Sequence, residues 1–273
     1  DYRGLYGSEQ PDSTAGFSVR ALCNDAHDLM KHLGLKRWEC VCGWSTGVQV
    51  ALEFAGLFPD CLDRLFLVNG GHGHTLRFFA QPMPQLVTVG FMSHLVEAVI
   101  WLVRFSVCTS PELFESFKAR YLSVVEALTS TVFRAMGFLL SNPSLEYTMA
   151  TNMCDLVSNG PAHCNNVLRI LQTLDCHSAA YNLPEVRTPI LVVAGLLDWM
   201  TPAFTQYEIA ALAPRCRIVP FMAGTHHCIL EFPRLASREI AGFLTADVDH
   251  LAKYWGKPES GGKIARPVAW GLL

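Results

Sequence analysis

The sequence predicts an α/β protein with a mostly parallel sheet, flanking helices and an inserted helical lid. Strands and helices alternate in two separate parts of the chain, before residue 75 and after residue 183. Between them, residues 75–183 have helical patterns rich in Phe, Leu, Val and Met. A sheet whose strands lie on both sides of a long helical insert is typical of a core that carries a lid. With 273 residues, 51% of them hydrophobic and 16% charged, the chain is long and apolar enough to bury such a core.

The first part of the core begins with an expected helix over residues 18–33, where apolar side chains recur at helical spacing and Gly34 offers a C-terminal stop. An apolar strand at 38–42 and a helix at 48–55 follow. The all-apolar run 65–68 predicts a strand covered on both faces, as in a parallel sheet.

The second part of the core repeats the alternation after Pro189. Strands are expected at 190–195 and 217–221, and helices at 204–212 and 235–244. The predicted organisation is therefore a first part of the core at 1–74, a lid at 75–183, a second part of the core at 184–245 and a tail at 246–273, to which no function is assigned.

Bulk properties narrow the classes of partner. The net charge is −3 and no basic block occurs, which argues against nucleic acid. The ten cysteines are scattered without zinc-type CxxC pairs, which favours a reducing compartment such as the cytoplasm. The most hydrophobic run, 86–108, contains His94, Glu97 and Arg104 and is therefore a poor transmembrane helix. We expect a buried or interfacial helix there, with contact to a membrane surface as the less favoured alternative.

A candidate nucleophile lies between the strand at 38–42 and the helix at 48–55. The segment from Gly43 to Gly47 has the pattern G-x-S-x-G, with Ser45 at its centre. Glycines on both sides of the serine let strand and helix approach closely. The serine hydroxyl then stands above a helix N-terminus, where free N–H groups favour developing negative charge. The short pattern also occurs by chance, but the strand before it and the helix after it support the functional interpretation.

A nucleophilic serine needs a base, and the base needs an acid that orients it. Asp198 follows the expected strand 190–195, at the carboxyl edge of the sheet, although a turn aspartate is the simpler alternative. The base candidates His226 and His227 follow the last expected strand. The order Ser45, Asp198, histidine matches the order of a known serine-hydrolase architecture.

Four segments together resemble the α/β-hydrolase superfamily, in its lid-bearing branch of serine esterases and lipases. They are Asp1-Tyr2-Arg3-Gly4 with Ser8, the elbow at 43–47, Gly195 to Pro202, and Gly224-Thr225-His226 followed by Glu231-Phe232-Pro233. In that family the histidine stands at a fixed step before Glu-x-Pro, which implies that His226 is the base and His227 a wall or capping residue. Tyr6 departs from the pattern, because the family usually has glycine at that position.

The resemblance implies an acyl-enzyme mechanism with no metal or organic cofactor. The apolar composition of the expected lid suggests a small substrate with a hydrophobic acyl or alcohol part, and packing of the lid aromatics on one another is an equal alternative. Ser45 attacks, His226 takes its proton, and Asp198 orients the imidazole. The backbone N–H of Thr46 is one expected oxyanion donor, and Trp44 and Trp199 are candidate substrate-binding residues. The family's second donor comes from a His-Gly loop on a strand that precedes the Asp-x-Arg-Gly segment. We therefore expect a partial sequence that lacks N-terminal strands, which leaves the elbow strand with an open edge.

Two alternatives to a hydrolase remain open at this stage. One is an acyltransferase that uses the same three residues with an alcohol or thiol acceptor. The other is a non-catalytic ligand-binding or scaffold protein, because a fold alone does not define a function. The intact triad positions favour an enzyme, whereas the expected lack of an N-terminal loop favours the scaffold. The sequence does not indicate an oligomeric state.

Overall fold

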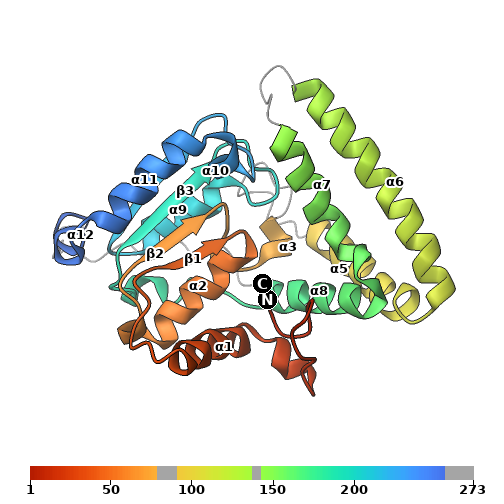
Figure 1. The fold of residues 1–273 in the computed structure, drawn as a ribbon, viewed down its shortest axis with the longest axis horizontal. Coiled ribbons are helices and arrows are strands. Elements are labelled where there is room, and N and C mark those ends of the chain that lie inside the picture. The colour runs from red at the N-terminus through yellow and green to blue at the C-terminus, as the bar shows by residue number, and fades with distance from the viewer. Residues whose placement is uncertain (79–90, 137–142, 256–273) are drawn as a thin grey trace. The chain divides into compact units, whose positions relative to one another are not determined.

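The computed structural model describes residues 1–78, 91–136 and 143–255 (Figure 1). The chain forms two compact units. The first comprises Asp1–Ser18 and His94–Thr173, and the second comprises Val19–Ser93 and Leu174–Leu273. The helices and strands, in chain order, are α1 (Val19–His32), β1 (Val41–Trp44), α2 (Thr46–Leu57), β2 (Leu65–Val68), α3 (Thr75–Phe78), α5 (Phe91–Leu102), α6 (Pro111–Met136), α7 (Pro143–Ser158), α8 (Gly160–Asp175), β3 (Ile190–Gly195), α9 (Ala203–Leu212), β4 (Cys216–Phe221), α10 (Cys228–Glu231), α11 (Pro233–Thr245) and α12 (Val248–Tyr254).

The second unit is built on a parallel sheet with the strand order β1-β2-β3-β4. β2 and β3 occupy the centre, and every residue of both strands is buried. This burial explains why their sequences are continuous apolar runs, since a parallel strand is covered on both faces. β1 lies at one edge of the described sheet and pairs with β2 from Val41 opposite Leu65 to Trp44 opposite Val68.

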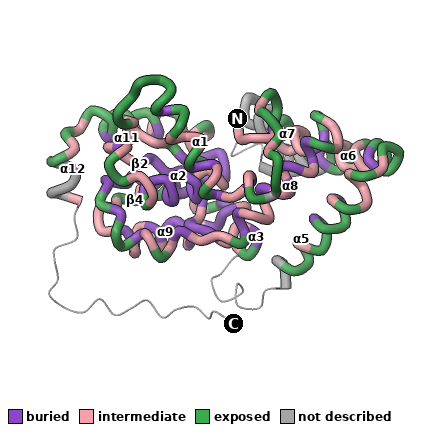
Figure 2. The backbone as a smooth tube through the Cα atoms, turned by 90° about the horizontal axis from the view of Figure 1, so that it is seen from below, coloured by how far each residue is buried: buried purple, intermediate pink, exposed green. Residues whose placement is uncertain are grey.

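Helices cover both faces of this sheet. Alternate residues of β2 and β3, such as Phe66 and Val193, form a buried cluster with residues of α11 and α12. α2 contacts β1 and β2, and α9 contacts β3 and β4. Because successive strand residues point to opposite faces, the remaining residues of β2 and β3 face these two helices. Figure 2 shows the buried residues concentrated along β2 and α2.

The first unit is helical in the part that the structure describes. α5 passes into a π-helix at Val103–Val107, and α6 and α7 pack against each other. The first 18 residues belong to this unit, because the Asn166 amide of α8 donates hydrogen bonds to the Gly4 carbonyl oxygen (2.8 Å) and to Gln10 Oε1 (2.7 Å). Tyr6 OH donates to Asp155 Oδ2 (3.0 Å). Tyr6 has a φ of 52°, a backbone conformation that favours glycine. This conformation explains why the family usually has glycine at the position of Tyr6.

The α/β fold class with a parallel sheet and flanking helices is confirmed, and the strands expected at 65–68 and 190–195 have those bounds. The expected strand at 38–42 is displaced, since β1 begins at Val41 and runs up to the residue before Ser45. Trp38 instead forms an isolated bridge with Leu62. Within the described ranges, no helix combines the length and apolarity needed to cross a membrane. Residues 86–90 of the hydrophobic run lie outside those ranges, and the division into core and lid stays a prediction.

Candidate active site

Ser45 occupies the turn between β1 and α2. Its φ of 55° and ψ of −122° are strained for a residue with a side chain, and its N–H donates to the Val68 carbonyl oxygen of β2 (2.9 Å). Gly43 makes the turn possible, because a Cβ atom at this position would lie 2.6 Å from the Gly47 carbonyl oxygen. Thr46 is the first residue of α2, so the helix supplies no acceptor for its N–H. The turn therefore presents a hydroxyl beside a helix N-terminus.

His226 links this hydroxyl to Asp198. The distance from His226 Nε2 to Ser45 Oγ is 2.9 Å, and the distance from His226 Nδ1 to Asp198 Oδ2 is 2.8 Å. A carboxylate accepts hydrogen bonds, so Nδ1 carries the proton and Nε2 is free to accept from the serine. Both Asp198 and His226 are buried. The three side chains thus lie in the order nucleophile, base and acid.

The Asp198 carboxylate is held by its own loop. Oδ1 accepts from the N–H groups of Met200 (2.9 Å) and Thr201 (3.0 Å). Thr201 Oγ1 lies 2.7 Å from Asp198 Oδ2 and 2.6 Å from the Asn69 carbonyl oxygen, both of which accept hydrogen bonds. It also lies 3.3 Å from His226 Nδ1. These contacts fix the position of the carboxylate beside the imidazole.

Asn69 ties the acid loop to the histidine loop. It follows β2, is fully buried and has a φ of 45°, a conformation that asparagine tolerates well. Its Oδ1 accepts from the Gly195 N–H at the end of β3 (2.7 Å), and its Nδ2 donates to the Thr225 carbonyl oxygen (2.8 Å). One side chain therefore fixes the strand end before Asp198 and the residue before His226.

Two further residues hold the histidine loop. Glu231 Oε2 accepts from the Thr225 N–H (2.7 Å), and Glu231 Oε1 accepts from the Thr225 hydroxyl. Burial raises the pKa of the Glu231 carboxyl, and the two hydrogen bonds from Thr225 oppose that rise. Trp44 Nε1 donates to the His226 carbonyl oxygen (3.1 Å), which joins the serine turn to the histidine loop.

His227 is buried beside His226 but has a different environment. Its ring lies 5.2 Å from the Trp44 ring and 5.6 Å from the His226 ring, measured between centroids. Burial, and then the neighbouring His226, lower the pKa of His227 to about 4. Its side chain makes no capping hydrogen bond at the start of α10. His227 is therefore neutral at pH 7, and its role as a wall residue stays a prediction. His226 is the histidine that contacts Ser45.

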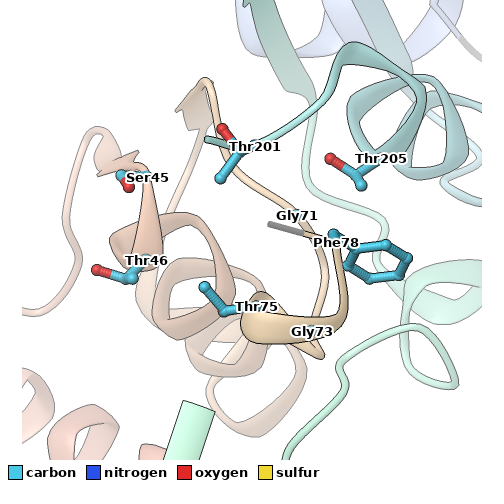
Figure 3. Close-up of a pocket in the computed structure, with 8 residues that line it drawn as sticks. All are labelled: Ser45, Thr46, Gly71, Gly73, Thr75, Phe78, Thr201 and Thr205. Carbon is cyan, nitrogen blue, oxygen red and sulfur yellow. The ribbon is translucent and has the colours of Figure 1, made fainter. Parts of the chain in front are cut away.

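A small hollow adjoins Ser45 in the second unit (Figure 3). Its walls are glycines and threonines, together with the ring of Phe78 at the end of α3. The lining residues are Ser45, Thr46, Gly71, Gly73, Thr75, Phe78, Thr201 and Thr205. Neither Trp44 nor Trp199 belongs to this set, so a contact between these indoles and a substrate stays a prediction.

The structure brings together Ser45, Asp198 and His226, and their catalytic roles stay a prediction. Asn69, which holds the two loops of this site, was not among the residues predicted from the sequence. A single asparagine after an apolar strand and before two glycines has the signal of an ordinary turn. Its partners, Gly195 and Thr225, are more than 120 positions away. In the described parts of the chain, no group of three His, Cys, Asp or Glu side chains has an arrangement that could hold a metal ion.

A family model described as alpha/beta hydrolase fold matches residues 1–232. An uncharacterized protein of Mycobacterium tuberculosis is 43% identical over 68 residues, which cover 24% of this chain. The matched segment spans 20% of the length of that mycobacterial protein. A pimeloyl-[acyl-carrier protein] methyl ester esterase of Nitrosomonas europaea is 26% identical over 197 residues, covering 71% of this chain and 66% of the esterase.

Solved structures show the same arrangement of the chain. A hydrolase from Oleispira antarctica has a TM-score of 0.63 at 16% identity, covering 90% of this chain and 80% of the hydrolase. An enol-lactonase from Burkholderia xenovorans has a TM-score of 0.61 at 18% identity, covering 90% and 79%. At these identities the likeness concerns the fold, and the chemistry has to be argued from the residues described above.

Proposed function

The chain belongs to the alpha/beta hydrolase fold family, and from this premise we propose that it is a serine hydrolase that cleaves an ester or a related acyl bond of a small molecule. The observation that carries the proposal is the continuous hydrogen-bonded series from Ser45 through His226 to the buried Asp198. Each member has the polarity that acyl transfer requires: an O–H donor, a neutral imidazole and a carboxylate acceptor.

In the proposed mechanism, His226 Nε2 takes the proton as Ser45 Oγ attacks the acyl carbon. The Thr46 N–H, at the positive end of α2, donates to the oxygen that becomes negatively charged. Asp198 keeps the proton on Nδ1 and stabilises the imidazolium. His226 then protonates the leaving group, and water releases the acyl group from Ser45 by the reverse sequence of proton transfers. A sequence relative named as a methyl ester esterase supports this reaction class.

The test is hydrolysis of p-nitrophenyl esters by the full-length protein and its Ser45→Ala variant. We expect the variant to lose kcat by a factor on the order of 10⁶ while its melting temperature stays unchanged. Ser237→Ala, an exposed position on α11, is the matched control and is expected to retain full turnover. Equal turnover by Ser45→Ala and the wild type would remove the proposed nucleophile.

The same assay separates the proposed hydrolase from an acyltransferase. Addition of an alcohol or thiol acceptor diverts the acyl group from water in an acyltransferase, so the acylated acceptor becomes the main product. In a hydrolase, the free acid remains the main product at moderate acceptor concentrations. A protein without any serine-dependent turnover, but with ligand binding, would instead favour a scaffold.

A further inference from the structure

Ser45 and His226 reach each other from opposite edges of the described sheet. Ser45 follows β1, the first strand in the order β1-β2-β3-β4, and His226 belongs to the loop that follows β4, the last strand. β2 and β3 lie between these two strands. The distance of 2.9 Å between His226 Nε2 and Ser45 Oγ therefore depends on contacts that hold the histidine loop toward β1.

Trp44 makes a direct contact of this kind. It is the last residue of β1, where it pairs with Val68 of β2, and it immediately precedes Ser45. Its indole Nε1 donates a hydrogen bond to the His226 carbonyl oxygen (3.1 Å). An indole side chain has only two rotatable bonds, and the main chain of Trp44 is fixed in the sheet. The side chain therefore limits the distance between the main chains of Ser45 and His226.

Two other residues hold the histidine loop, but neither is next to the nucleophile in sequence. Asn69, at the end of β2, donates to the Thr225 carbonyl oxygen (2.8 Å), and Glu231 of α10 accepts from the Thr225 N–H (2.7 Å). Both act on the residue before the base. Trp44 acts on His226 itself, and it comes from the strand that ends at the nucleophile.

The indole ring also contacts both imidazoles of this loop. The centroid of the Trp44 ring lies 5.3 Å from that of His226 and 5.2 Å from that of His227. Trp44 is 38% exposed, whereas each histidine is 4% exposed. The indole therefore contributes to the burial of the two imidazoles. Exclusion of water strengthens the electrostatic interaction of His226 with Asp198.

We propose that Trp44 is a positioning residue for the base: its N–H sets the place of His226 relative to Ser45, and its ring shields the imidazole from water. The inference rests on the proposed serine hydrolase and adds a residue to the same site. It differs from the expectation that Trp44 binds substrate. Loss of a positioning contact lowers kcat, whereas loss of a contact that only binds substrate raises KM.

The experiment measures kcat and KM of the full-length protein for p-nitrophenyl acetate. Trp44→Phe keeps an aromatic ring and loses the N–H donor. We expect its kcat to fall by about tenfold while KM stays within about twofold of the wild-type value, because a displacement of about 1 Å can cost about 10² in rate.

Trp38→Phe is the matched control, since Trp38 precedes the other end of β1. Its hydrogen bonds with Cys61 and Asp63 are made by its main chain, which phenylalanine retains. We expect this variant to keep the wild-type kcat.

A second measurement does not depend on turnover. Burial, and then the neighbouring His226, lower the pKa of His227 to about 4, and Asp198 acts in the opposite direction. Trp44→Ala should expose His227 and raise its pKa toward the ordinary value of 6.5, whereas Trp44→Phe should leave it unchanged. NMR titration of the His227 ring protons measures this pKa, and Trp44→Leu is a milder variant should Trp44→Ala unfold.

A folded Trp44→Phe protein with the wild-type kcat, whatever its KM, would overturn the positioning role and leave the serine hydrolase intact. An unchanged titration of His227 in folded Trp44→Ala or Trp44→Leu would overturn the shielding by the ring. Absence of any Ser45-dependent turnover in the wild type would overturn the proposed function, and the positioning role with it.

Discussion

The nucleophile and the acid–base pair of this site are built in opposite ways. Ser45 owes its geometry to a local turn at the end of the edge strand β1, in which a Cβ atom at Gly43 would collide with the Gly47 carbonyl oxygen. Asp198 and His226 are held by their own loops, and these loops are fixed to each other by Asn69, which is more than 120 positions away in sequence. The comparison teaches that a short motif is enough to aim a nucleophile, whereas the base has to be fixed by the assembled sheet.

The largest expected effect in this comparison comes from the acid. Asp198→Asn keeps an oxygen acceptor for the N–H groups of Met200 and Thr201, but it removes the charge that holds the His226 tautomer. We expect kcat for ester hydrolysis to fall by about 10⁴ with little loss of stability. Steady-state kinetics and thermal unfolding measure the two quantities.

Asp60→Asn, at an exposed position after α2, is the control for this change of charge and should behave as the wild type. Full turnover by Asp198→Asn would mean that another group orients the imidazole, and the acid half of the comparison would be wrong.

The same contrast explains how much the sequence predicts. The turn that carries Ser45 is predictable because the five residues of its G-x-S-x-G motif are contiguous. β2 and β3 are predictable because burial on both faces leaves four to six apolar residues in a row. β1 was displaced by three residues at its start, because an edge strand with exposed Cys42 and Trp44 carries no such run. Asn69 acts through contacts across the sheet, and no pattern along the chain reports such contacts.

A smaller effect is expected for Asn69→Ala, and it should appear in stability as well as in activity. The variant leaves the Gly195 N–H and the Thr225 carbonyl oxygen without their partner in a buried position. A buried polar group without a partner costs about 1–3 kcal/mol, so the free energy of unfolding should fall by at least about 2 kcal/mol. Urea denaturation followed by fluorescence gives this value.

Asn24→Ala, an exposed position on α1, controls for the loss of an asparagine. Asn69→Asp keeps the acceptor for Gly195 but places a buried carboxylate oxygen against the Thr225 carbonyl oxygen, so its stability should fall at least as far as that of Asn69→Ala. If the Asn69→Ala protein is as stable as the wild type, the loops that carry Asp198 and His226 are stable without the hydrogen bonds from Asn69.

The smallest expected effect is the pH dependence that His227 contributes. The folded protein lowers the pKa of His227 from 6.5 to about 4, so between these pH values the unfolded chain binds more protons than the folded protein. Its contribution to stability is therefore complete above pH 6.5 and is lost as the pH falls toward 4. The melting temperature should decrease over this interval, and His227→Phe, which does not titrate, should show a shallower decrease. Parallel curves for the two proteins would contradict the lowered pKa of His227.

The most direct test of the central claim is covalent labelling of the nucleophile in the full-length protein. A fluorophosphonate reacts with a serine that is activated by a histidine, and tandem mass spectrometry of the digested protein locates the adduct. We predict one phosphonyl group on Ser45 in the wild type, and its loss in a His226→Ala variant that retains the wild-type melting temperature. A stable wild-type protein that carries no adduct, or carries it on another residue, would contradict the assignment of Ser45 and His226 as nucleophile and base.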